Sequence, residues 1–196
     1  LSNTYGTEFE ELYTKYEKEI PDLKKVKARA LMSKIIEAQI ETGQPYMLYK
    51  DSINNKSNQK NIGVIKSSNL CAEIVEYSEK DETAVCNLAS IALPKFVTDE
   101  GKYDYQDLYQ VAKLATKNLD QVIDINFYPT DKTENSNSRH RPIGLGIQGL
   151  ADVYFKMNIP YDSVQAQIIN KQIFETIYFG ALEASMELAA DKGAYS

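Results

Sequence analysis

The feature that most constrains the fold is an unbroken helical spacing of apolar residues in the middle of the chain. The apolar side chains that recur at every third or fourth position are Leu108, Val111, Ala112, Ala115, Leu119, Val122 and Ile123. Asp104 stands in front of this run, where its carboxylate can accept hydrogen bonds from the first free backbone amides of a helix. The spacing therefore predicts an amphipathic helix that begins at Asp104 and packs one face against a core.

Two shorter patterns predict helices nearer the N-terminus. Thr7 and Glu10 match the capping box of a helix start, and apolar side chains follow them at helical spacing. A second periodic run covers residues 24–42, and Gly43 behind it favours a helix end. We therefore expect a helical lead-in over residues 1–49.

The C-terminal half is also predicted to be mainly helical. Residues 145–157 are predicted to contain a helix, which Pro160 ends. Residues 163–192 predict a long helix, or a pair of helices that meet near Gly180. Residues 104–196 are therefore expected to form a helical remainder.

The segments between these helices are polar or compatible with strands. Residues 51–61 and 131–138 are rich in polar side chains and lack periodicity, so we expect surface loops. Residues 69–77 and 83–92 contain side chains typical of strands, which predicts two short strands or strand-like arms. This order of elements is that of a helix-rich α/β chain.

A carboxamide, a thiol and a carboxylate follow one another at alternate positions: Asn69, Cys71 and Glu73. In an extended segment alternate side chains point to the same side, so these three would share one face. A carboxylate is a poor choice for a packed core, because it must be hydrogen-bonded or solvated when it is buried. The grouping indicates a site for chemistry on a polar substrate.

Simpler interpretations exist for the cysteines and the single histidine. A cysteine such as Cys71 is often a small buried hydrophobe, and Cys86 lies in an apolar run that favours a core thiol. His140 could serve either cysteine in a cysteine-dependent hydrolase. However, it lies between Arg139 and Arg141, which disfavour the protonated imidazole that stabilises a thiolate. A structural histidine is the simpler interpretation.

Three glycines match the spacing of the dinucleotide-binding fingerprint: Gly144, Gly146 and Gly149. That fingerprint requires an apolar strand in front of the first glycine, whereas residues 137–142 are polar. We therefore predict close backbone packing at a helix start here, and no nucleotide site.

Composition argues against several classes of function. The chain has 196 residues, 43% of them apolar, and a formal net charge of −6, so it can bury a core but offers no broad basic surface for nucleic acid. It has no apolar stretch of about 18 residues and no basic-then-apolar leader, so neither a membrane span nor a secretory signal is expected. Its two cysteines do not make a secreted disulfide framework, and a reducing, cytoplasmic location is expected.

Three long runs carry a resemblance to a known family: KSSNLCAEIVEYS over residues 66–78, ETAVCNLASIALPKFV over 82–97 and RHRPIGLGIQGLADVYF over 139–155. They resemble the large, catalytic subunit of class I ribonucleoside-diphosphate reductase in its eukaryotic or viral form. The resemblance implies an α/β fold, a ten-stranded barrel with the catalytic cysteine on a loop in its middle. The chain would be an internal fragment of it, a single partial domain over residues 1–196 with the active-site loop and strands at 62–95.

The resemblance also implies roles for individual residues. Cys71 resembles the cysteine that becomes a thiyl radical and removes the hydrogen atom from C3′ of the ribose. Glu73 is similar to the general base for the 3′-hydroxyl, Asn69 to the amide that hydrogen-bonds the ribose region, and Leu70 would complete the substrate-binding segment. Cys86 resembles one cysteine of a redox-active disulfide, whose partner lies upstream and is absent here.

The function implied is reduction of ribonucleoside diphosphates to 2′-deoxyribonucleoside diphosphates for deoxyribonucleotide biosynthesis and DNA replication. No cofactor or metal is expected in this chain. The radical would come from a metal-containing small subunit, ATP and deoxynucleotide effectors would bind the parent protein, and a thioredoxin- or glutaredoxin-type protein would be the reductant. A large-subunit homodimer or higher oligomer is expected, without direct DNA or membrane binding. The alternative is a non-catalytic structural or association module, and we expect the isolated chain to be inactive.

Overall fold

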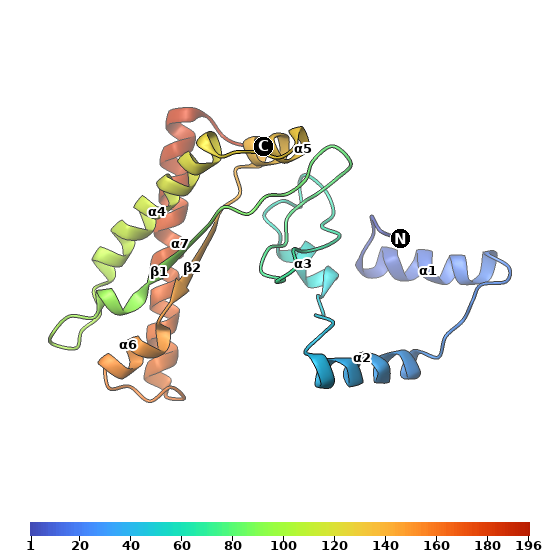
Figure 1. Ribbon diagram of the computed structural model, residues 1–196, viewed down its shortest axis with the longest axis horizontal. Helices are drawn as coiled ribbons and strands as arrows, with labels where there is room; N and C mark the ends of the chain where they lie inside the picture. Colours follow the sequence, from blue (N-terminus) through green and yellow to red (C-terminus); the bar gives the residue numbers. More distant parts are fainter. The chain divides into compact units, whose positions relative to one another are not determined.

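The computed structural model describes all residues from Leu1 to Ser196 and consists of two compact units, Leu1–Glu79 and Lys80–Ser196 (Figure 1). The first unit carries Cys71 and the second carries Cys86. The boundary between the units falls inside the 62–95 segment that the sequence analysis treats as one. No helix is both long enough and apolar enough to cross a membrane.

The first unit contains three helices: α1 (Gly6–Glu19), α2 (Ala28–Thr42) and α3 (Lys50–Lys56). The helices predicted in this region are confirmed, and Gly43 ends α2 in the left-handed conformation at a φ of 75°. The predicted capping box is wrong, because Tyr5 is the N-cap and Thr7 lies inside α1. Neither α1 nor α2 contains a buried residue.

The surface loop predicted over residues 51–61 is wrong for residues 51–56, which belong to helix α3. A hydrogen-bonded asparagine stabilises this helix. Asn54 is almost completely buried. Its Nδ2 donates to the carbonyls of Lys50 (2.9 Å) and Ile65 (3.0 Å), and its Oδ1 accepts from the Ile65 amide (2.8 Å). These bonds join α3 to the buried Ile65, four residues before Asn69, and therefore anchor the segment that leads to the candidate site.

The second unit holds both strands and the longest helices (Figure 1). Its elements are β1 (Leu88–Ala92), the 3₁₀ helix η1 (Leu93–Phe96), α4 (Tyr105–Ile125), α5 (Asp131–His140), β2 (Gly144–Gln148), α6 (Leu150–Lys156) and α7 (Val164–Lys192). The strands β1 and β2 pair in parallel, with Leu88 opposite Gly144 and Ala92 opposite Gln148. The order of a strand, helices and a parallel strand defines an α/β unit.

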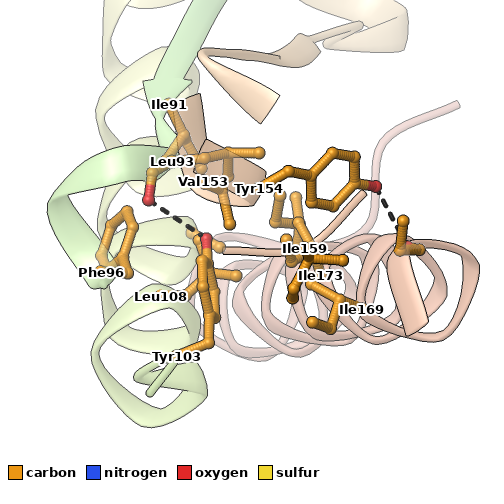
Figure 2. Packing of buried hydrophobic residues seen from close by; sticks show 13 residues of the cluster. Ile91, Leu93, Phe96, Tyr103, Leu108, Val153, Tyr154, Ile159, Ile169 and Ile173 are labelled. Atoms are coloured by element: carbon orange, nitrogen blue, oxygen red, sulfur yellow. Dashed lines mark hydrogen bonds between the residues drawn. The ribbon is translucent and has the colours of Figure 1, made fainter. Parts of the chain in front are cut away.

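A hydrophobic core fills the space between η1, α4, α6 and α7 (Figure 2). Its largest fully buried side chains are Leu93, Leu108, Val153 and Ile173. Two tyrosines at its margin keep their hydroxyls bonded: Tyr103 donates to the carbonyl of Leu93 at 3.4 Å, and Tyr154 to that of Ala166 at 3.0 Å.

Helices α4 and α7 pack along one another and confirm the strongest predictions. Asp104 caps α4, and its carboxylate accepts a 2.9 Å hydrogen bond from the Asp107 amide. Helix α7 is continuous, so the alternative of a helix pair near Gly180 is wrong. Gly180 instead marks the crossing, because a Cβ atom there would lie 3.0 Å from the Tyr109 carbonyl oxygen.

Two other predictions in this unit require correction, and one strand was missed. The loop predicted over residues 131–138 is α5, which a capping box of Thr130 and Thr133 begins. The helix predicted within residues 145–157 is confirmed as α6, but the strand β2 at the start of that range was not predicted. The strand predicted over 83–92 is limited to Leu88–Ala92. Helix α5 buries three polar side chains, Ser136, Asn137 and His140, which hydrophobic periodicity does not detect.

Candidate active site

The segment with Asn69, Cys71 and Glu73 is a tight turn. The amide of Ala72 donates to the Asn69 carbonyl at 3.2 Å, and the amide of Asn69 donates to the Ile74 carbonyl at 3.3 Å. Ala72 has a φ of 67°, in the left-handed region that L-residues rarely adopt. The strand predicted over 69–77 is therefore wrong, and the alternation argument for one shared face does not apply.

The side chain of Asn69 closes this turn. Its Oδ1 accepts hydrogen bonds from the Ile74 amide at 3.1 Å and is 3.2 Å from the Ser68 hydroxyl. That hydroxyl lies 2.6 Å from the Ile74 carbonyl, to which it donates. These contacts use the oxygen of the Asn69 amide and neither of its two hydrogens. The same residue can therefore hold the turn and donate to another molecule.

The tip of the turn presents its side chains to solvent. Leu70 is 88% exposed, and both Cys71 and Glu73 are exposed. An exposed carboxylate keeps its hydration, so Glu73 has no desolvation cost to offset. The turn thus offers a thiol, a carboxylate and an apolar side chain within four consecutive residues.

Cys86 lies in the second unit, two residues before β1, and its side chain is exposed. The core location that its apolar neighbours favour is therefore wrong. The next residue, Asn87, is buried at 4% exposure. The chain thus changes from an exposed thiol to a buried carboxamide in one step, as alternation along an extended backbone allows.

His140 is buried and paired with an acidic residue that the sequence analysis missed. Its Nε2 lies 2.6 Å from a carboxylate oxygen of Glu82, and its Nδ1 lies 3.4 Å from the Ser196 carbonyl. The guanidinium of Arg139 forms an ion pair with the other carboxylate oxygen of Glu82. Because the imidazole is held in this cluster at 4% exposure, the structure favours the structural interpretation of His140.

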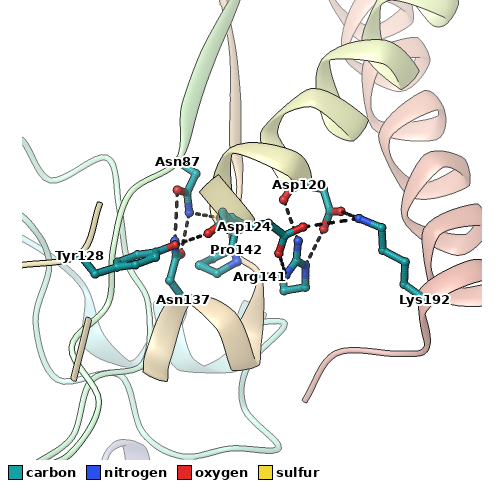
Figure 3. A network of polar contacts seen from close by, with 9 residues as sticks. Asn87, Asp120, Asp124, Tyr128, Asn137, Arg141, Pro142 and Lys192 are labelled. Atoms are coloured by element: carbon teal, nitrogen blue, oxygen red, sulfur yellow. Dashed lines mark hydrogen bonds and ion pairs between the residues drawn. The ribbon is translucent and has the colours of Figure 1, made fainter. Parts of the chain in front are cut away.

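Arg141 ends α5 and joins it to α4 (Figure 3). Its Nε lies 2.6 Å from Asp120, and a second guanidinium nitrogen lies 2.8 Å from Asp124. Lys192 lies 2.8 Å from the other oxygen of Asp120. Burial alone would raise the pKa of Asp120, but the hydrogen bonds from Arg141 and Lys192 outweigh it and hold that pKa below its usual range.

Two buried asparagines also meet in this region (Figure 3). Nδ2 of Asn87 lies 2.6 Å from Oδ1 of Asn137, and Nδ2 of Asn137 lies 3.3 Å from Oδ1 of Asn87. The sequence carried no signal for this pair, because its members are 50 residues apart. No group of three or more His, Cys, Asp or Glu side chains is placed to hold a metal ion.

Comparison with known proteins identifies the class of fold to which this geometry belongs. The family model described as "Ribonucleotide reductase, barrel domain" matches residues 1–196. The ribonucleoside-diphosphate reductase large subunit of Danio rerio is 58% identical over 195 residues, which are 100% of this chain and 25% of that protein. The large subunit of Variola virus is 57% identical with the same coverage.

A solved structure agrees with the sequence matches. The class Id ribonucleotide reductase alpha subunit of Actinobacillus ureae superposes with a TM-score of 0.76 at 30% identity, over 94% of this chain and 35% of that one. The chain is thus a helix-rich section of an α/β barrel domain. It belongs to the ribonucleotide reductase barrel-domain family and spans about a quarter of the length of the curated relatives described above.

Proposed function

We propose that this chain is the section of a ribonucleoside-diphosphate reductase large subunit that presents the radical cysteine. The parent subunit would reduce ribonucleoside diphosphates to 2′-deoxyribonucleoside diphosphates. The observation that carries the proposal is the turn from Asn69 to Ile74, which exposes Cys71 and Glu73 in a chain matched to the family along its whole length.

The side chains of the turn suit the proposed chemistry. A thiyl radical at Cys71 takes the hydrogen atom from C3′, so an S–H bond forms and a C–H bond breaks. Glu73 takes up the proton of the 3′-hydroxyl as charge develops, a contribution of about 10²- to 10⁴-fold. The two amide hydrogens of Asn69, which the turn does not use, donate to the ribose oxygens, and Leu70 covers the substrate beside them.

The reduction needs two electrons, which a pair of thiols supplies. Cys86 and a cysteine from an upstream part of the parent lose two electrons and two protons and become a disulfide. The 2′-hydroxyl leaves C2′ as water, and Cys71 returns a hydrogen atom to C3′. A thioredoxin- or glutaredoxin-type protein then reduces the disulfide, and a small subunit that contains a metal supplies the radical.

The remaining partners also belong to the parent. We propose a homodimer or higher oligomer of large subunits, regulated by ATP and deoxynucleotides, in the cytoplasm. The two strands of this chain pair in parallel, as strands of an α/β barrel do. Parallel sheets are normally covered on both faces by other elements. Leu88, in β1, is 52% exposed here and would be covered by the rest of the barrel.

The test replaces Cys71 in the full-length large subunit, assayed with its small subunit for conversion of a labelled ribonucleoside diphosphate. Cys71→Ser is expected to abolish turnover, and Glu73→Gln to lower kcat by about 10²-fold or more. Ser67→Ala, an exposed change two residues before Asn69, is the matched control and should retain full activity. Substantial reduction by the Cys71→Ser subunit would contradict the radical assignment.

A second candidate function, a non-catalytic association module, is favoured by the outer face of α7. That face consists of apolar side chains that are at least half exposed: Ile168, Tyr178, Phe179, Leu182 and Met186. A contiguous exposed apolar patch on a helix whose other face is already buried is typical of an interaction surface. For the chain of 196 residues on its own, we propose association without turnover, and multiple turnovers by this chain alone would refute that.

A further inference from the structure

Asn87 and Asn137 form a closed, buried amide pair directly beside Cys86 (Figure 3). The exposed fractions are 4% for Asn87 and 0% for Asn137. Each amide donates to the oxygen of the other, at 2.6 and 3.3 Å. A buried carboxamide is costly unless its hydrogen bonds are made, so this pair has one favourable arrangement.

The pair is tied to the backbone on the strand side. Nδ2 of Asn87 also donates to the Pro142 carbonyl at 2.9 Å, and the Asn87 carbonyl accepts from the Gly144 amide at 2.9 Å. These two bonds hold the residue after Cys86 against the connection from α5 to β2. The bond from Gly144 lies at the first β1–β2 pair, in which Leu88 is opposite Gly144, and therefore fixes where the parallel strands begin.

The pair is tied to α4 on its other side. Nδ2 of Asn137 lies 2.5 Å from the Tyr128 hydroxyl, which donates to the Ile123 carbonyl at 2.7 Å. Ile123 belongs to the buried face of α4. A continuous set of hydrogen bonds therefore links a core helix to the residue next to Cys86.

From this geometry we infer that Asn87 and Asn137 are positioning residues for Cys86. The inference rests on the proposed function, in which Cys86 forms a disulfide in every turnover. A disulfide demands an S–S distance of about 2.05 Å and a Cβ–Cβ distance of about 4 Å, so a displaced backbone slows its formation. Asn87 points into the protein and Cys86 points out of it, so the amide pair fixes the backbone from which the thiol projects.

The experiment uses the full-length large subunit with its small subunit, with a dithiol reductant for multiple turnovers and without one when the disulfide of a single turnover is measured. Asn87→Ala removes the pair, and Tyr128→Phe removes only the hydroxyl that supports it. Tyr154→Phe is the matched control, because it deletes a buried hydroxyl bonded to the Ala166 carbonyl, away from Asn87. The measurements are kcat, KM for the ribonucleoside diphosphate, the disulfide formed at Cys86 in one turnover, and thermal unfolding.

We expect Asn87→Ala to lower kcat and the yield of Cys86 disulfide by about tenfold or more, because small displacements of a reacting group have effects of this size. KM should stay within about twofold, since substrate binding is unchanged. Tyr128→Phe should lower kcat by about threefold at the same KM. Tyr154→Phe should unfold at a lower temperature than the wild type and keep its kcat.

Two results would overturn the inference, and they are distinguishable. If Cys86→Ser abolishes multiple turnovers but Asn87→Ala and Tyr128→Phe keep kcat, the amide pair does not position the thiol. If Cys86→Ser itself sustains multiple turnovers, the proposed role of Cys86 fails and the inference with it. Should Asn87→Ala not fold, the kcat of Tyr128→Phe against that of Tyr154→Phe decides.

Discussion

Gly180 lies where α7 crosses α4. Its replacement by alanine has two opposite effects on the free energy of unfolding. Alanine favours a helix interior over glycine by about 1 kcal/mol. However, the new Cβ would lie 3.0 Å from the Tyr109 carbonyl oxygen and 3.3 Å from Cβ of Ala112. The carbonyl belongs to the backbone of α4, so it cannot turn aside as the end of a flexible side chain does.

The contact is expected to outweigh the propensity. Overpacking a close contact costs about 1–3 kcal/mol, so with a central value of about 2 the net loss for Gly180→Ala is about 1 kcal/mol. Gly180→Val adds two methyl groups at the same place, and we expect it to cost about 3 kcal/mol or more. Both values refer to unfolding of the second unit.

The assay compares the chain with a peptide of α7. Urea unfolding followed by circular dichroism gives the free energy for the wild type and both variants. In the isolated peptide of residues 163–193 no α4 is present, so Gly180→Ala should increase helicity. The reasoning is refuted if Gly180→Ala stabilises the whole chain by about 1 kcal/mol, the full gain in helix propensity. The two helices would then move apart to accept the methyl group at no cost.

Three further predictions concern the ion cluster, the anchor of the turn and the surface of α7. Although burial raises the pKa of Asp120, Arg141 helps to hold it below its ordinary value. As the pH falls, the Asp120 carboxylate is therefore protonated in the unfolded chain before it is protonated in the folded one. The stability that this pair adds is present above the ordinary pKa of an aspartate, about 4, and is lost as the pH falls below it, so urea unfolding of Asp120→Asn should depend less on pH in that acidic range. Asn54→Ala leaves the Ile65 amide without its acceptor and should cost about 2 kcal/mol, with faster hydrogen exchange at that amide. Leu182→Lys, at a half-exposed position, should leave thermal unfolding unchanged but reduce self-association in sedimentation; unchanged association would contradict a role for that face.

In the second unit, hydrophobic periodicity predicted the two long helices, α4 and α7, each of which buries an apolar face. In α4 the buried residues Leu108, Ala112, Leu119 and Ile123 follow the predicted spacing, and Asp104 caps the helix as expected. Helix α7 was predicted for the same reason, although its outer face is apolar as well. These elements depend on side chains whose burial is visible in the local sequence.

The missed elements depend on contacts between distant residues. Helix α5 has a polar sequence. Its buried Asn137 bonds Asn87, 50 residues away in the chain, and its buried His140 bonds Glu82, 58 residues away. Helix α3 is held by the buried amide of Asn54, which bonds Ile65 11 residues further along the chain. Strand β2 is rich in glycine, so only its pairing with β1 identifies it as a strand.

The residues of the candidate site were selected from the sequence, but their arrangement was not. Side chains at alternate positions share a face only on an extended backbone, and the left-handed φ of Ala72 interrupts that backbone between Asn69 and Glu73. The roles of Asn69, Cys71 and Glu73 in catalysis stay predictions, whereas the exposure of the thiol and of the carboxylate is observed. Asn87 and Asn137 could not have been found without the fold.

Asn69 combines two functions that a single substitution does not separate. Its Oδ1 holds the turn through the Ile74 amide, and under the proposed function its two amide hydrogens donate to the substrate. An alanine at this position removes both contributions, so a loss of turnover would not show which one matters. An aspartate keeps an acceptor for Ile74 and removes only the donor, although it adds a negative charge close to Glu73. The loss of turnover from the wild type to the aspartate variant therefore measures the donor role of Asn69 with the turn still closed, and the further loss from aspartate to alanine measures the contribution of the closed turn.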